Sequence, residues 1–70
     1  MNPVEQFGHN LREARKRKGW TQEDLAEKAG LTSVQVSRVE RGAREIRLTT
    51  LLRLISALDS KPEHLLRGLY

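Results

Sequence analysis

Apolar residues recur at intervals of three and four along this chain, which is the spacing of one face of an α-helix. The first such stripe predicts a helix between Asn2 and Gly19, with Asn2 as its N-cap and Glu5 at the capping-box position. Gly8 lies within the stripe and costs about 1 kcal/mol relative to alanine, which makes it a candidate for close packing. The stripe consists of Val4, Phe7, Leu11 and Ala14.

The centre of the chain predicts two short helices joined by a tight turn. Thr21 precedes Asp24 by three residues, and Thr32 precedes Gln35 by three, so each threonine can cap a helix through a capping box. Gly30 ends the first of these helices, and we expect it to have a positive φ because almost no loop follows it. Two capped helices with such a turn form a helix-turn-helix.

The strongest helical signal lies between Leu48 and Leu58, where leucine and isoleucine form a broad stripe. The charged segment before it leaves the start of this helix open, with Thr49 as an alternative cap. Pro62 is expected to begin a last helix that runs to the end of the chain. One short helix cannot bury all of its apolar residues, so we predict that they form the interface of a symmetric homodimer. These residues are Leu65, Leu66, Leu69 and Tyr70.

The central motif resembles the Cro/repressor (XRE-type) family of DNA-binding domains. The resemblance lies in the segments TQEDLA, AGL and VSRVERG, and the family's layout accommodates nearly the whole chain. It implies an all-α, compact five-helix, lambda-repressor-like fold in which residues 1–70 form a single helix-turn-helix DNA-binding domain. The implied function is sequence-specific binding of double-stranded DNA by a bacterial or phage transcriptional regulator that dimerises on a palindromic operator.

The expected recognition helix, about Ser33 to Arg41, would enter the major groove through its N-terminal half. Val36 and Val39 lie one turn apart and should face inward, which leaves a polar and basic face opposite them. On that face Arg38 can donate twice to a guanine. Four positions match the base-facing positions of the family: Ser33, Val34, Ser37 and Arg38.

Contacts to DNA phosphates are expected from neighbouring positions. Gln22 matches the family's glutamine at the start of the first motif helix, where the helix N-terminus faces a phosphate. Arg44 and Arg47 follow the recognition helix, where the family's loop approaches the DNA backbone, although the alternative of ordinary solvated loop charges stays open. The predicted phosphate contacts are Gln22, Thr32, Gln35, Arg41 and Arg44.

A structural ion pair is also expected, between Arg15 and Glu40. The resemblance implies this pair, because the family has an arginine at the position of Arg15 that pairs with a glutamate at the position of Glu40. The helical periodicity independently places Glu40 beside the inward face, where a carboxylate needs a partner.

Composition and charge agree with a nucleic-acid partner. The 70 residues carry a net charge of +4, which makes a polyanion a plausible partner, while an aromatic content of 4% argues against a stacking platform for single strands. The chain has no cysteine, no apolar run long enough to span a membrane and no signal-peptide pattern, so we expect a cytoplasmic protein.

An enzyme is the competing class of function, and the sequence does not favour it. The two histidines, His9 and His64, lie far apart and in no metal-ligand spacing, and no serine has the surroundings of a nucleophile. We therefore expect no catalytic residue, no metal, no cofactor and no small-molecule ligand. The remaining alternative is an antitoxin or a restriction-modification controller protein, which binds DNA and also a protein partner.

Overall fold

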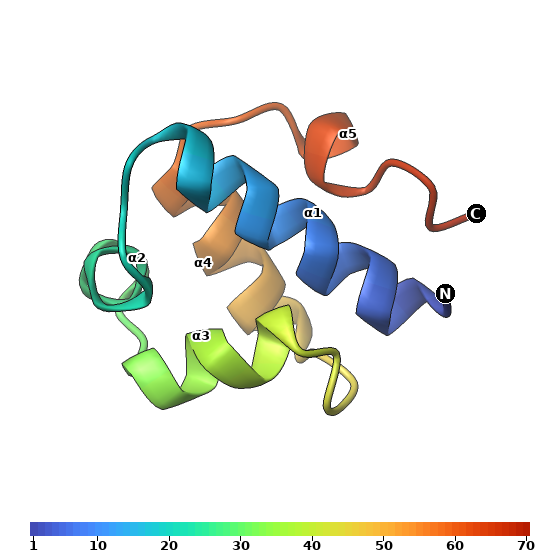
Figure 1. Cartoon of the computed structure of the whole chain (residues 1–70), viewed down its shortest axis with the longest axis horizontal. Helices are drawn as coiled ribbons and strands as arrows, with labels where there is room; N and C mark the ends of the chain where they lie inside the picture. Colours follow the sequence, from blue (N-terminus) through green and yellow to red (C-terminus); the bar gives the residue numbers. More distant parts are fainter.

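A computed structural model describes all 70 residues, and it contains helices only. In Figure 1, α1 crosses the middle of the molecule, with α3 on one side of it and α5 on the other. None of the helices is long and apolar enough to cross a membrane. The helices are α1 (Pro3–Arg17), α2 (Gln22–Ala29), α3 (Ser33–Glu40), α4 (Leu48–Leu58) and α5 (Pro62–Leu65).

Local hydrogen bonds fix the starts of the first three helices. In α2 the Asp24 backbone N–H donates to the Thr21 hydroxyl, and the Thr21 N–H donates to the Asp24 carboxylate. The same reciprocal pair forms between Asn2 and Glu5 before α1, and between Thr32 and Gln35 before α3. All three predicted capping boxes are therefore confirmed.

The start of α4 differs from the alternative offered by the sequence. The helix begins at Leu48, with Arg47 as its N-cap and no side-chain hydrogen bond at the cap. Thr49 lies inside the first turn and does not cap the helix. The alternative cap at Thr49 is therefore wrong, because a residue that is already inside the helix cannot take the non-helical backbone of an N-cap.

Ten apolar residues from all five helices form one core. Gly8 lies where α1 crosses the C-terminal end of α3, and a Cβ atom added there would stand 2.4 Å from the carbonyl oxygen of Val39. The close packing suggested for Gly8 is thus confirmed, because only a residue without a side chain permits this approach. The core residues are Phe7, Leu11, Leu25, Ala26, Ala29, Val36, Val39, Leu54, Leu58 and Leu65.

The prediction for the C-terminal helix is wrong in its extent. The helix ends at Leu65, and the chain then turns through Gly68, which has a φ of 82°. Leu65 is fully buried in the core, so it is not available to an interface with another chain. Asn10 ties this segment to α1, because its Nδ2 donates to the carbonyl oxygens of Leu65 and Arg67 at 2.8 Å each.

Candidate nucleic-acid interface

The turn between α2 and α3 is built as the sequence predicted. Gly30 has a φ of 69°, in the left-handed region that favours glycine. Its carbonyl oxygen accepts a hydrogen bond from Arg53 Nη1 of α4 at 3.2 Å. The turn is therefore held by its own backbone conformation and by a side chain from a distant helix.

Helix α3 has one buried face and one open face. Val36 and Val39 are buried, whereas Val34 is 55% exposed and Arg38 is exposed. The Arg38 guanidinium makes no hydrogen bond or ion pair within the chain, so its donors are available to a ligand. Ser33 and Ser37 lie on the same side of the helix and are half-buried.

An ion pair locks α3 to α1 behind the open face. Arg15 Nε lies 2.7 Å from Glu40 Oε2, and Arg15 Nη2 donates to Glu40 Oε1 at 3.1 Å, so the expected pair is confirmed in a bidentate form. Hydrogen bonding to Glu40 raises the pKa of Arg15 above its usual value. Arg15 Nη1 also donates to the carbonyl oxygen of Trp20 at 2.8 Å, which ties in the segment before α2.

Gln22, predicted to contact a phosphate, has a partner inside the protein as well. Its Nε2 donates to Glu40 Oε1 at 3.0 Å. The first residue of α2 is thereby oriented by the same carboxylate that holds Arg15. One amide N–H of Gln22 is not used by this bond and is the group left for a phosphate. Sequence periodicity carried no signal for this contact, because it joins residues 18 apart through the tertiary fold.

The other predicted phosphate contacts lie around α3. Gln35 uses its Oε1 to accept from the Thr32 N–H at 2.8 Å, which leaves its NH₂ group free. Arg41 is exposed and donates from Nε to the carbonyl oxygen of Ser37 at 3.3 Å. Arg44 is exposed in the loop after α3.

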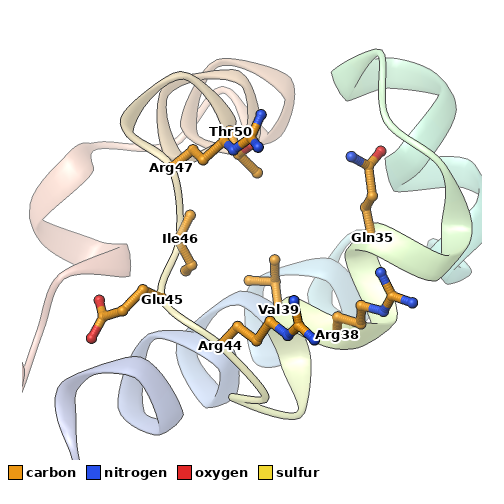
Figure 2. Close-up of a pocket in the computed structure, with 8 residues that line it drawn as sticks. All are labelled: Gln35, Arg38, Val39, Arg44, Glu45, Ile46, Arg47 and Thr50. Atoms are coloured by element: carbon orange, nitrogen blue, oxygen red, sulfur yellow. The ribbon is translucent and has the colours of Figure 1, made fainter.

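A pocket of about 300 Å³ lies between α3 and the start of α4. Figure 2 shows Arg38, Arg44 and Gln35 around its opening, with the Glu45 carboxylate pointing away. The pocket brings together Arg38, Arg44 and Arg47, which are not adjacent in the sequence. Thr50, which the sequence did not single out, lines it from the first turn of α4. The lining residues are Gln35, Arg38, Val39, Arg44, Glu45, Ile46, Arg47 and Thr50.

A comparison with family models matches residues 11–65 to a model described as Helix-turn-helix, HTH_3. The chain belongs to this helix-turn-helix family. The XRE-type resemblance is thereby confirmed. The HTH-type transcriptional regulator YqaE of Bacillus subtilis is 37% identical over 62 residues, which are 89% of this chain and 53% of YqaE. The chain spans about half the length of the curated relatives it matches.

Solved structures of other helix-turn-helix proteins share the fold. The restriction-modification controller protein C.AhdI from Aeromonas hydrophila is 45% identical, with a TM-score of 0.84 over 89% of this chain and 94% of that one. The P22 c2 repressor, crystallised with a synthetic operator, is 34% identical, with a TM-score of 0.78 over the same shares. The fold of this family member is therefore all-α, five-helix and lambda-repressor-like, as expected.

Proposed function

We propose that this helix-turn-helix protein binds double-stranded DNA in a sequence-specific manner and regulates transcription, with α3 in the major groove. The observation that carries the proposal is the open face of α3, where Arg38 has no partner in the chain, next to a pocket lined by Arg44 and Arg47. Base edges are read by side chains on such a helix, while arginines beside it grip the phosphates. This function would be carried out in the cytoplasm, where bacterial DNA lies.

The proposed base contacts have separate chemical roles. Arg38 donates both arms of its guanidinium to O6 and N7 of a guanine, which is the commonest specific contact. Val34 packs its exposed methyl groups against a thymine methyl group. Ser33 and Ser37 bond to either donor or acceptor edges and discriminate less.

The proposed phosphate contacts surround this set on both sides. Gln22, oriented by Glu40, presents its spare amide N–H together with the N-terminus of α2. On the other side of α3, Arg44 and Arg47 approach the backbone from the pocket, and Gln35 offers its free NH₂ group. Thr32 and Arg41, at the two ends of α3, complete the phosphate-binding set.

Two substitutions separate base contacts from phosphate contacts. Arg38→Ala is expected to weaken binding to the cognate duplex by roughly 1–3 kcal/mol and to relax the preference at one base pair. Arg44→Ala is expected to weaken cognate and scrambled duplexes equally and to lower the slope of log K against log salt by about one. The cognate duplex comes from selection on random DNA, followed by titrations at several salt concentrations. Equal weakening of both duplexes by Arg38→Ala would contradict the assignment of Arg38 to a base.

We further propose that the protein acts as a symmetric dimer on a palindromic operator. One recognition helix specifies only a few base pairs, whereas two related by a two-fold axis meet successive major grooves about 34 Å apart. Because Leu65 is in the core, the proposed interface shifts to apolar side chains that remain accessible. Leu48 and Leu52, one turn apart on α4, are 68% and 55% exposed. Leu66 and Leu69 are half-buried, and Tyr70 is fully exposed.

Sedimentation equilibrium at micromolar protein tests the dimer. Leu52→Glu places a charge in the proposed interface and is expected to shift the equilibrium to monomer. Arg12→Glu, exposed on α1 and therefore on a different helix from Leu48 and Leu52, is the control and should leave the dimer intact. A wild-type chain that sediments as a monomer would reject the dimer and leave the DNA-binding proposal to its own test.

A small controller protein of a restriction-modification system is the second candidate for the biological role. It is favoured by the identity to C.AhdI, which extends over nearly the whole of that protein. The DNA selected by the chain distinguishes this role: its sites should occur next to restriction and methyltransferase genes of the source genome. Sites confined to unrelated promoters would argue for a general regulator instead.

A further inference from the structure

A second polar pocket, of about 250 Å³, lies between α1 and the C-terminal segment. Its lining has no apolar side chain, and it brings together both histidines of the chain, which are 55 residues apart in the sequence. Arginines from both sides of the junction accompany them. The side chains that matter are His9, Asn10, Glu13 and Arg17 of α1 and His64 and Arg67 of the C-terminal segment.

The charges in this pocket are not balanced internally. Arg17 and Arg67 contribute two guanidinium groups, and Glu13 is the single carboxylate of the lining. Glu13 and Arg17 stand at the i, i+4 spacing that favours a helix ion pair, yet the ion pair of this structure is the one between Arg15 and Glu40. Both guanidinium groups therefore keep their donors free for a ligand.

The histidines add donors of the same kind. Neither His9 nor His64 makes a side-chain hydrogen bond to the protein, and a neutral or protonated imidazole offers at least one N–H. No group of three or more histidine, aspartate or glutamate side chains is placed to hold a metal ion. The site is thus rich in cationic and N–H donors and poor in metal ligands.

A hydrogen-bonded network holds the two sides of the pocket in place. Asn10 Nδ2 donates both of its protons in hydrogen bonds to the carbonyl oxygens of Leu65 and Arg67. Its Oδ1 accepts from Gln6 Nε2 at 2.9 Å. The backbone that carries His64 and Arg67 is therefore fixed against α1, which places the donors before a ligand arrives.

The pocket lies away from the proposed DNA-binding face. Gly8 marks the side of α1 that packs on the end of α3. At about 100° per residue, Asn10, Glu13 and Arg17 lie roughly 140–200° around the helix from Gly8, which is the opposite side of α1. In Figure 1, α5 accordingly lies across α1 from α3. A duplex held by α3 would leave this pocket open to solvent.

We propose that this pocket binds a small oxyanion, namely a phosphate group, free or carried by a small metabolite. Arginine forks match the oxygen geometry of phosphate, and a tetrahedral dianion can accept at once from donors that converge from two sides. The pocket is smaller than the sites that enclose drug-sized ligands, which fits an anionic head group better than a large molecule. The proposal stands independently of DNA binding.

Titration of the full chain with inorganic phosphate, followed by two-dimensional ¹H–¹⁵N NMR at constant pH and constant ionic strength, tests the site. The expected result is a saturable shift of the amide signals of Arg67 and Gly68 and of the His9 and His64 side chains. Chloride at the same ionic strength should not produce it. Absence of saturation over the millimolar range, or an equal response to chloride, would overturn the proposal.

Variants show whether the pocket itself is responsible. Arg17→Gln and Arg67→Gln each remove one charge and are expected to raise the dissociation constant for phosphate about tenfold. Arg12→Gln, exposed on α1 outside the pocket, removes the same charge and should leave it unchanged. Equal weakening by all three would indicate general surface electrostatics and overturn the site.

The source of the phosphate is distinguished by two further titrations. A small sugar phosphate should shift the same signals, at a lower concentration than inorganic phosphate if the site takes a phosphate carried by a metabolite and at a higher one if it takes free phosphate. A short DNA duplex should leave them in place while shifting signals of α3. Pocket signals that respond to the duplex but not to the small phosphates would make this surface a DNA-backbone contact and overturn the proposal. Failure of the duplex to shift α3 would count against the proposed function alone.

Discussion

Replacing Gly8 with alanine is the sharpest test of how α1 positions the DNA-binding helix. In an ordinary helix interior this substitution stabilises by roughly 1 kcal/mol, because glycine loses more backbone freedom on folding than alanine. Here the added Cβ would lie 2.4 Å from the Val39 oxygen, 2.7 Å from the Glu40 oxygen and 2.9 Å from the Glu40 carbonyl carbon. All three are backbone atoms, so no side-chain rotation can relieve the contact.

The size of the effect follows from the movement required. The end of α3 would have to retreat from α1 by about 1 Å to restore ordinary contact distances. That movement also pulls the Glu40 carboxylate away from Arg15, whose Nε now lies 2.7 Å from it. Overpacking of this kind typically costs about 1–3 kcal/mol, and three contacts with rigid backbone atoms place this case near the upper limit. Subtracting the gain of about 1 kcal/mol in helix propensity leaves a net destabilisation of about 2 kcal/mol. For a domain of this size this lowers the melting temperature by about 10 °C.

Thermal and urea unfolding followed by circular dichroism measure the change. Arg12→Ala, exposed on the same helix, reports the effect of a neighbouring alanine without the contact and should be nearly neutral. Because α3 is displaced in the folded variant, Gly8→Ala should also bind the selected duplex more weakly at temperatures where it remains folded. A Gly8→Ala protein as stable as the wild type would refute the reasoning, since helix propensity would then outweigh the packing.

Three further predictions concern the turn, the ion pair and a cap. Gly30→Val should lower the free energy of unfolding by roughly 1–3 kcal/mol, because a β-branched residue is strained at a φ of 69°. Gly30→Asn should lower it less, because asparagine tolerates the left-handed region better. An unchanged melting temperature for Gly30→Val would contradict the strain at this position. Glu40→Ala should lower the free energy of unfolding by about 3 kcal/mol, because the Arg15 and Gln22 donors lose their acceptor. A double-mutant cycle with Arg15→Ala should give a coupling energy of at least about 1 kcal/mol, whereas additive effects of the two substitutions would mean that the ion pair contributes nothing to stability. The hydrogen bond from the Thr21 N–H holds the pKa of Asp24 below its ordinary value of 3.8. The stabilisation by the Asp24 carboxylate is therefore present above that pH and is lost as the pH falls through the pKa of the folded state. The stability difference between wild type and Asp24→Asn should shrink below about pH 4, and a difference that stays constant with pH would refute this role of Asp24.

Signals between near neighbours were sufficient to predict much of this fold. Each capping box joins a side chain to a backbone group three residues away, so its residues and spacing are visible in the sequence. The left-handed turn at Gly30 follows in the same way from two capped helices with no room for a loop. The inward faces of α1 and α3 follow from their periodicity, because residues three and four apart share one side of a helix.

The ends of elements without such local signals were predicted less well. The last helix was expected to continue to Tyr70, but the backbone leaves the helix after Leu65. Apolar spacing does not say where a short helix stops when no cap marks its end. The same spacing could not say which leucines close the core, and the packing of α5 on α1 decided that Leu65 does.

The sequence by itself determined the helix-turn-helix, its caps, and the side of α3 that faces solvent, because these depend on residues within one or two turns of each other. The tertiary structure alone decided the contacts between distant segments. It placed Gln22 on Glu40, gathered Arg38, Arg44 and Arg47 around one pocket, and brought His9 beside the segment that carries His64. The physical reason is that helix faces are set by local periodicity, whereas helix neighbours are set by how those faces pack, down to the backbone contact that only a glycine at position 8 allows.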